Sequence, residues 1–512
     1  MTEDAGARMI RIATDYDAEV IVAGGGPAGA AAASRLAREG ISVIVIDRVK
    51  FPRDKVCGDF VGPVALVELG DLGVHEMDGY LASNVARRAT LYLDGSELIS
   101  RLFPNLEGMP SYGRVVPRIL LDNWILDAAR DAGARIITGY PIVGFNRTDD
   151  GVLTEVAGPS GRFTLRSRLL IGADGSSSTV ARAMRGSAPP RGDRIVAVRA
   201  YYENVAGAAD QLDLYFTSLA FPGYYWLFPT GNGAANVGLG MALETIPEHV
   251  ETPAALLTRL IEKDSALSAR LTNARLRGKV MGWPLITYNH RLPIIDDRVM
   301  LIGDAAGLIN PLNGEGIQYA LLSGRWAAET VGECIRQRDF SAAALAPYAT
   351  RVERELRYDM ALARLIVQLI TNRGLNPVWL EALRIIATRA RKDAAYAAIA
   401  GGILAGLAPA RSAISLKVIG GTIDQAAMSL GIKAVMTAFT GPAAWAGIGV
   451  DTAQVGFQLA YDAALNPMGF ADWLMRVASD AVELGAQASW DAIIGGGGGT
   501  RDPSAPAVRL TA

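Results

Sequence analysis

The chain has 512 residues, of which 50% are hydrophobic and 20% are charged, so it is long enough for several structural units and too apolar for a disordered protein. Fifty basic side chains balance 52 acidic ones, and this near-neutral charge excludes the electrostatic signature of a nucleic-acid-binding protein. Two cysteines, Cys57 and Cys334, and a start that carries acidic residues predict a cytoplasmic protein with no secretory signal. The three histidines are scattered, so no metal site is predicted.

A glycine-rich turn stands near the start of the chain. Residues 17–23 (DAEVIVA) predict a strand, residues 30–40 a helix, and residues 42–47 a second strand. The spacing Gly24-x-Gly26-x-x-Gly29 lies between the first strand and the helix, where it permits a tight turn, close approach of a pyrophosphate and helix-on-strand packing. This order predicts a βαβ unit that binds a dinucleotide.

The second strand ends in an acid, Asp47, which lies 23 positions after Gly24. A carboxylate at this point can accept hydrogen bonds from the ribose hydroxyls of an adenosine. The position therefore favours FAD or NAD over NADP.

A second cluster follows a short predicted strand at residues 299–302. It runs from Gly303-Asp304 through Pro311 to Gly314-Glu315-Gly316-Ile317 and leads into a predicted helix. Backbone N–H groups at a helix start suit a ring edge that gains negative charge on reduction, which favours a flavin. A purely structural turn is the alternative.

Three further motifs join these two clusters in order: residues 51–58 (FPRDKVCG), Arg118-x-x-x-Asp122-x-x-x-Leu126, and Gly172-Ala173-Asp174-Gly175. Together the five motifs resemble the flavoprotein family of geranylgeranyl reductases, flavin halogenases and aromatic hydroxylases. The resemblance implies a doubly wound (Rossmann-like) α/β FAD-binding domain with an interleaved antiparallel-sheet substrate domain and a C-terminal helical domain.

Carried over residue by residue, the resemblance implies an extended FAD site. Its pyrophosphate would lie at the first turn, its adenosine at the second strand, its ribityl chain near Arg118 and Asp304, and its ring near Cys57 and the loop before residue 317. The implied cofactor-binding residues are Gly24, Gly26, Pro27, Ala28, Gly29, Asp47, Arg48, Cys57, Gly58, Arg118, Asp174, Gly303, Asp304, Pro311, Gly314, Gly316 and Ile317.

The middle of the chain points to one branch of this family. Tyr224-x-Trp226-x-Phe228-Pro resembles an element of geranylgeranyl reductases whose aromatic side chains line the substrate pocket, although core aromatics are the plainer interpretation. In the resembling halogenases a lysine of the tunnel handles hypohalous acid, and this chain has no lysine between Lys55 and Lys263, so the resemblance disfavours halogenation. Cys57 is the candidate catalytic residue, as a proton donor or ring-tuning thiol, with ordinary core packing as the alternative.

The remainder of the chain, from residue 346, has helical character. Residues 394–410 and 434–450 carry no charged side chain and could be buried helices, membrane-surface contacts or spans at the lower limit of length. We predict an FAD-binding domain at 1–80, 113–183 and 281–345, a substrate domain at 81–112 and 184–280, a helical cap at 346–494 and a flexible tail at 495–512.

The predicted function is that of an FAD-dependent oxidoreductase that reduces C=C bonds in a large hydrophobic unsaturated isoprenoid or polyketide substrate. NAD(P)H could serve as a transient reductant, because no second dinucleotide motif is present. Non-redox [4+2] cyclisation of a polyene, a flavin monooxygenase and a non-catalytic flavin sensor stay open as alternatives. Contact with a membrane surface is a further expectation, and the sequence sets no oligomeric state.

Overall fold

The computed structural model describes residues 16–105, 108–158, 161–246, 252–398 and 466–494. Its first layer is a six-stranded sheet in the order β18-β19-β12-β1-β2-β8, parallel except for the β18/β19 pair. The strands are β1 (Val20–Ala23), β2 (Val43–Asp47), β8 (Arg135–Thr138), β12 (Leu169–Gly172), β18 (Ile295–Asp296) and β19 (Val299–Leu301).

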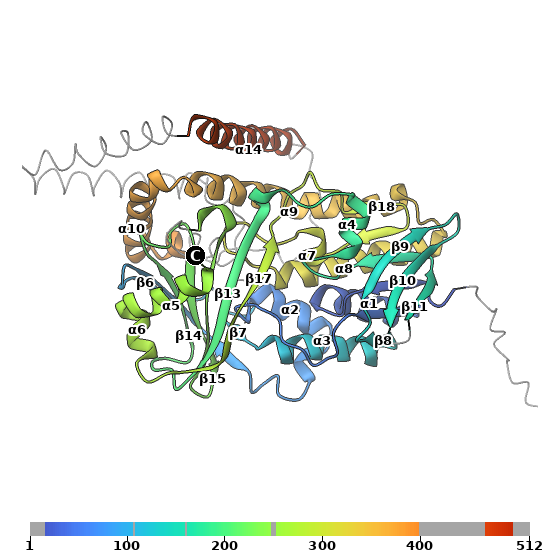
Figure 1. The fold of residues 1–512 in the computed structure, drawn as a ribbon, viewed down its shortest axis with the longest axis horizontal. Coiled ribbons are helices and arrows are strands. Elements are labelled where there is room, and N and C mark those ends of the chain that lie inside the picture. The colour runs from blue at the N-terminus through green and yellow to red at the C-terminus, as the bar shows by residue number, and fades with distance from the viewer. Residues whose placement is uncertain (1–15, 106–107, 159–160, 247–251, 399–465, 495–512) are drawn as a thin grey trace, which may run out of the picture.

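Helices cover this sheet, as the doubly wound prediction requires (Figure 1). Every residue of β1 and β2 is buried, which is typical of parallel strands with both faces covered. The helices of this part are α1 (Pro27–Arg38), α2 (Pro63–Asp71), α3 (Arg118–Asp131), α4 (Thr179–Arg185), α7 (Gly303–Ala306) and α8 (Ile317–Gln337). Helix α1 begins three residues earlier than predicted, because the fixed φ of Pro27 suits the first helical position.

A second, seven-stranded sheet has the order β17-β13-β16-β15-β14-β5-β6 and is antiparallel except between β14 and β5. Its strands are β5 (Arg88–Leu93), β6 (Ser96–Leu102), β13 (Arg194–Glu203), β14 (Gln211–Phe216), β15 (Tyr224–Gly231), β16 (Ala234–Ala242) and β17 (Arg275–Ile286). The predicted interleaved antiparallel sheet is confirmed. The predicted domain limits stay a prediction, and the limit at 280/281 falls within β17.

Side chains alternate along β15 in the way that a sheet with two covered faces requires. Tyr225 and Leu227 join a cluster with α5 (Pro253–Lys263) and α6 (Ser265–Leu271). Trp226 and Phe228 point to the other face and join a second cluster with Phe103. The period of two thus directs one aromatic pair toward the FAD-binding part of the molecule.

Two three-stranded sheets complete the strands of the described residues. One has the order β3-β7-β4 and the other β11-β10-β9. Their bounds are β3 (Phe60–Val61), β4 (Asn84–Ala86), β7 (Gly113–Val115), β9 (Ile142–Arg147), β10 (Val152–Gly158) and β11 (Gly161–Ser167).

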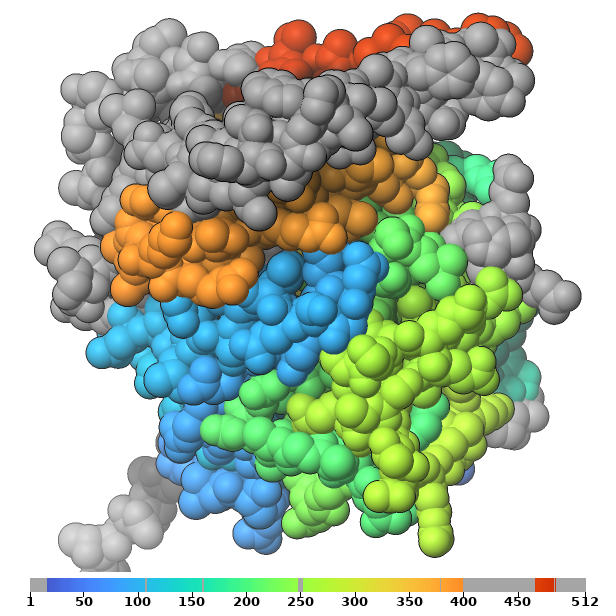
Figure 2. Space-filling view, turned by 90° about the vertical axis from the view of Figure 1, so that its left-hand side faces the viewer, coloured from blue at the N-terminus to red at the C-terminus, as the bar shows by residue number. Residues whose placement is uncertain are grey.

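The C-terminal part is helical, as predicted, with α9 (Ala342–Thr371), α10 (Asn376–Lys392) and α14 (Pro467–Ile494). Figure 2 shows α10, in orange, lying across the blue strands of the seven-stranded sheet, where Leu380 and Ala387 pack with Leu98. Helix α14 runs beside α9 (Figure 1). None of the helices in the described ranges has the length and hydropathy to span a membrane. Residues 399–410, 434–450 and the predicted tail at 495–512 lie outside the described residues.

Candidate FAD and substrate site

The glycines of the first turn fall into two kinds. Gly24 has φ +105°, and a Cβ there would lie 2.3 Å from the Ala173 carbonyl oxygen, while a Cβ at Gly29 would lie 2.0 Å from the Gly24 carbonyl oxygen. A Cβ at Gly26 would meet only the tip of the Arg53 side chain, at 3.4 Å. Gly24 and Gly29 are therefore required by the fold, whereas Gly26 leaves the approach to α1 open.

The start of α1 is open to an anion. Gly26 is its N-cap residue and gives no side-chain cap, and Pro27 occupies the first turn. The first backbone hydrogen bond of the helix is donated by Ala30, so the N–H groups of Ala28 and Gly29 before it are available. Oriented donors and the helix dipole at such an end favour a phosphate.

Asp47 ends β2 directly beside this turn. One carboxylate oxygen accepts the Gly25 N–H at 2.8 Å and the other accepts the Val49 N–H at 2.8 Å. Each oxygen keeps a lone pair, so the carboxylate can still accept ribose hydroxyls. The neighbouring Arg48 is exposed and lies over the ring of Trp283, 5.7 Å from its centroid.

The second glycine cluster packs directly on the first. A Cβ at Gly303 would lie 2.8 Å from the Cβ of Ala28, and a Cβ at Gly324 on α8 would lie 2.7 Å from the Ala28 carbonyl oxygen. Small residues on both helices thus let α8 approach α1 closely. The structure brings the two predicted motifs together, although Ala28 and Gly303 are far apart in the chain.

Asp304 lies between these motifs and is ionised. Burial acts to raise the pKa of Asp304, but the charge and hydrogen bond of Lys55, at 2.8 Å, together with Arg118 and Ser176, hold the pKa below its ordinary value. A Cβ at Gly316 would lie 3.4 Å from the Asp304 Oδ1 atom, so this carboxylate also faces the start of α8.

Arg118 is buried on α3 and forms a bidentate pair with Asp122, with distances of 2.6 and 2.8 Å. Arg53 also pairs with Asp122, at 2.9 Å. Cys57 lies beside the Arg118 guanidinium, and burial raises the pKa of its thiol despite that charge. Cys57 therefore keeps its proton at neutral pH.

Asp174 has a local structural role. Its carboxylate accepts the Ser178 hydroxyl, the Thr179 N–H at 2.6 Å and the Val180 N–H at 3.3 Å. It thereby holds the start of α4 and the strand end against which Gly24 packs. This placement agrees with a residue that supports the cofactor's surroundings.

The aromatic strand β15 touches both predicted flavin segments. A Cβ at Gly58 would lie 3.1 Å from the Phe228 ring and 3.5 Å from the Trp226 Nε1 atom. The Tyr224 hydroxyl donates a hydrogen bond of 2.6 Å to the Asn313 carbonyl oxygen. All three predicted pocket aromatics are thus placed at the junction of the two flavin segments.

A buried polar network, missed at the level of the sequence, holds the Cys57 loop to the seven-stranded sheet. Asn236 donates to the Cys57 carbonyl oxygen at 2.7 Å and to Asp59 at 2.8 Å, and it accepts the Trp226 indole N–H at 3.0 Å. Tyr201 donates to Asp59 at 2.6 Å. No local spacing signals this network, because its members come from four separate segments: the Cys57 loop, β13, β15 and β16. The positive φ of Asp59 appears only in the fold.

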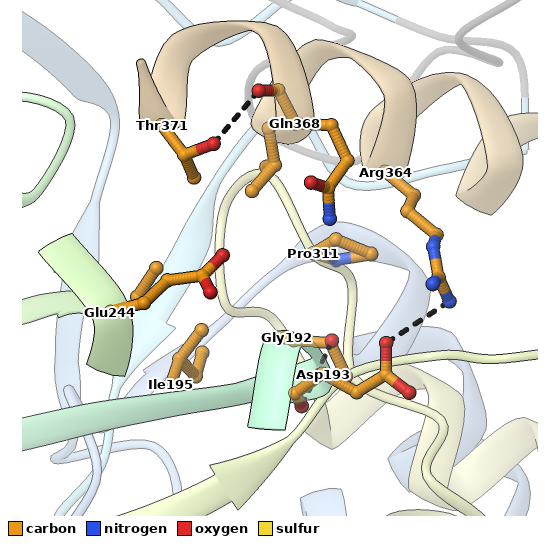
Figure 3. Close-up of a pocket in the computed structure, with 11 residues that line it drawn as sticks. Gly192, Asp193, Ile195, Glu244, Pro311, Arg364, Gln368 and Thr371 are labelled. Carbon is orange, nitrogen blue, oxygen red and sulfur yellow. Dashed lines mark hydrogen bonds and ion pairs between the residues drawn. The ribbon is translucent and has the colours of Figure 1, made fainter. Parts of the chain in front are cut away.

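Pro311 and Ile317 lie at the two ends of the second loop. Ile317 is buried at the start of α8. Pro311 lines a small pocket under α9, where Arg364 reaches from the helix to Asp193 at 3.0 Å (Figure 3). Arg364 also pairs with Asp480 of α14 at 3.3 Å. The ion pairs of Arg364 therefore connect α9 both to α14 and to the turn that precedes β13.

These features fit FAD. The open end of α1 suits its pyrophosphate, and Asp47 suits a ribose. Gly303 packs against Ala28 of α1, and Gly316 lies beside Asp304. These two contacts hold the second loop next to the first motif, on the side where the ring system of FAD would lie. The fit rests on the chemistry of these groups together, namely the N–H donors at the start of α1 and the carboxylates of Asp47 and Asp304, and not on any single residue.

Comparison with known proteins agrees with the site. Residues 17–234 match the model of the FAD binding domain, and residues 193–276 match that of the geranylgeranyl reductase catalytic domain. The chain is 36% identical over 330 residues to a menaquinone reductase of Mycobacterium tuberculosis, covering 62% of this chain and 77% of that protein. It is 30% identical over 378 residues to digeranylgeranylglycerophospholipid reductase 1 of Methanopyrus kandleri, covering 70% and 92%.

Solved structures share the fold. A geranylgeranyl bacteriochlorophyll reductase-like protein of Thermoplasma acidophilum superposes with a TM-score of 0.62 at 24% identity, covering 79% of this chain and 95% of that one. A halogenase solved in complex with FAD gives a TM-score of 0.58 at 16% identity, covering 77% and 87%. Taken with the sequence relatives and the site geometry, these matches show that the chain is an FAD-dependent oxidoreductase and belongs to the geranylgeranyl reductase-like family of flavoproteins.

Proposed function

We propose that this protein reduces carbon–carbon double bonds of a long isoprenoid chain carried by a lipid or a quinone. The observation that carries the proposal is the contact of β15 with both predicted flavin segments, through Gly58 and Asn313. An aromatic wall at this point puts an apolar chain beside the flavin. The reductase names of the sequence relatives support the same substrate class.

The wall is apolar enough for such a chain. Phe60 stacks on Phe103 with ring centroids 5.9 Å apart, Trp226 stacks on Phe228 at 6.0 Å, and Phe60 lies 6.1 Å from Phe228. The indole N–H of Trp226 is already bonded to Asn236, so the wall presents ring faces rather than donors. An alkene bound against it would be held by shape and excluded from water.

In this proposal the cofactor-binding residues are those that the sequence predicted. Gly26, with Pro27, Ala28 and the turn glycines, would hold the pyrophosphate, and Asp47 and Arg48 the adenosine side. Reduced FAD would supply a hydride. The following residues would line its ribityl and ring portions, either directly or by supporting those that do: Cys57, Gly58, Arg118, Asp174, Gly303, Asp304, Pro311, Gly314, Gly316 and Ile317.

An anaerobic assay tests the function. The purified flavoprotein is reduced with NADPH, NADH or dithionite and then mixed with menaquinone or a geranylgeranyl lipid. We expect the flavin to be reoxidised by the substrate and the product to gain two hydrogen atoms. A product of unchanged mass formed without reductant would instead indicate cyclisation, and gain of one oxygen atom in air would indicate a monooxygenase; either result would refute the proposal.

We further propose that the protein works in the cytoplasm and takes its substrate at a membrane surface. Helix α14 supports the membrane contact, because it exposes Met468, Met475 and Val482. These apolar side chains are spaced by seven residues and are 84%, 65% and 72% exposed. Supplying the substrate in phospholipid vesicles and measuring co-sedimentation tests it, and protein that stays wholly in the supernatant would refute it. The anaerobic assay described above also shows whether NADPH or NADH reduces the flavin.

A further inference from the structure

The loop between α7 and α8 also carries a carboxyl group, that of Glu315. Its backbone is firmly held: the Glu315 N–H donates to Asn313 Oδ1 at 3.0 Å, and its carbonyl oxygen accepts the Asn310 N–H at 2.9 Å. Its side chain forms no hydrogen bond or ion pair with any residue of the described ranges. The backbone of Glu315 is thus fixed, while its carboxyl group is unengaged.

The Glu315 side chain points toward the aromatic wall. Its Oε1 atom lies 3.6 Å from the place of a Cβ on Gly62, where the Phe60 ring is equally close. The adjacent Gly314 lies near the Tyr224 hydroxyl, at 3.7 Å for a Cβ on that glycine. The carboxyl group therefore lies between the predicted flavin loop and the aromatic side chains that we assign to the substrate.

The groups that face Glu315 are the Tyr224 hydroxyl on β15 and the Tyr319 hydroxyl on α8, which stay uncharged at neutral pH because burial raises their pKa values. One step further out, the Cys57 thiol raises the pKa of Tyr224, and the Asp359 carboxylate on α9 raises the pKa of Tyr319. No cation offsets the burial, which raises the pKa of Glu315 to about 8. Asp304, eleven positions earlier, has Lys55 beside it and is ionised. Two carboxyl groups of one loop region are thus held in opposite protonation states, an arrangement typical of acid–base sites.

We propose that Glu315 is the proton donor for reduction of the double bond, an inference that rests on the proposed function. In this step the Glu315 O–H bond breaks and a C–H bond forms at one alkene carbon, and reduced FAD, when bound, would supply the hydride with both electrons for the neighbouring carbon. Glu315 is left as a carboxylate and regains its proton from solvent. The substrate is reduced, the flavin is oxidised, and the product gains two hydrogen atoms.

The other two candidate donors are less suited to give a proton. The Tyr224 O–H already donates to the Asn313 carbonyl oxygen at 2.6 Å. Burial raises the pKa of the Cys57 thiol and makes it a weaker acid than usual. Of the three groups, Glu315 combines a proton that no hydrogen bond holds with a pKa close to neutral pH, where a general acid is most effective.

The decisive variant is Glu315→Gln, which keeps the size and polarity of the side chain but has no transferable proton. In anaerobic single-turnover experiments with menaquinone or a geranylgeranyl lipid, we expect flavin reoxidation to slow about 100-fold or more, the usual contribution of a general acid. The wild-type rate should fall as the pH rises through about 8, and the rate of the variant should not follow that profile. FAD affinity and the flavin absorption spectrum should be unchanged. Glu333→Gln, which changes an exposed carboxyl near the end of α8, is the matched control and should keep the wild-type rate, whereas Cys57→Ser tests the rival donor.

A second measurement needs no turnover. Infrared difference spectra of the wild-type flavoprotein between pH 6 and pH 9 should show loss of a protonated carboxyl band, and this band should be missing from the Glu315→Gln spectra. A Gln variant that reoxidises like wild type, a Ser variant that alone loses the rate, or a Glu315 carboxyl already ionised at pH 6 would overturn the assignment. A wild type that binds flavin but reduces neither substrate would instead refute the proposed function.

Discussion

The Gly26→Ala variant tests whether Gly26 is needed for the approach of the ligand and not for the fold, unlike Gly24 and Gly29. Gly26 has φ −73°, which alanine adopts freely, and the added Cβ would meet only the mobile end of Arg53 at 3.4 Å. The flavin-free variant should therefore fold with a melting temperature within a few degrees of wild type. A methyl group at the mouth of α1 would, however, push a phosphate away from the backbone N–H groups.

The loss of affinity follows from the hydrogen bonds involved. One hydrogen bond to a charged group contributes about 1.5–3 kcal/mol, so losing one weakens FAD binding roughly 10- to 150-fold. Titration of the flavin-free protein with FAD, followed by the change in flavin fluorescence, measures this directly. Gly29→Ala is the contrasting variant and should fail to fold, because its Cβ would lie 2.0 Å from a backbone oxygen. A Gly26→Ala protein that binds FAD as tightly as wild type would refute the assignment of the pyrophosphate to this turn.

Two further predictions concern stability. Arg364→Ala should lower the free energy of unfolding by about 3 kcal/mol, measured by urea denaturation, because Asp193 and Asp480 both become buried charges without this cation; a change below about 1 kcal/mol would contradict this. Burial raises the pKa of Asp59 from 3.8 to about 6, so its stabilising neutral form is lost as the pH rises through 6. Between pH 4 and 7 the wild type should therefore lose about 2 kcal/mol relative to Asp59→Asn, and parallel pH profiles would refute the burial argument.

The elements around the first motif could be predicted because their signals are local. Strand β2 differs from its predicted range by one residue, and β19 ends one residue before its predicted end. A buried run of β-branched residues, a glycine turn and an alanine-rich helix each specify backbone geometry within a few residues. The family resemblance added the interleaved antiparallel sheet, which periodicity alone does not give.

The contacts that organise the site could not be predicted in this way. The Lys55–Asp304 pair joins residues 249 positions apart, and Asn236 bonds a carbonyl 179 positions away. Such partners are set by strand order and helix packing, so neither residue type nor spacing reveals them. Glu315 was visible within its motif, but whether a carboxyl is ionised depends on the cation beside it, and the sequence does not show that Lys55 reaches Asp304 rather than Glu315.

The packing of Ala28 against Gly303 and Gly324 has a consequence for how the protein is made. Strand β1 pairs with β12, which in turn pairs with β19, so the first sheet remains incomplete until the ribosome has added roughly three hundred residues. The nascent chain therefore presents the turn predicted to bind the nucleotide long before it can close around a coenzyme. We expect flavin capture to be a late event in biogenesis, and fragments ending before α8 to emerge from synthesis without it.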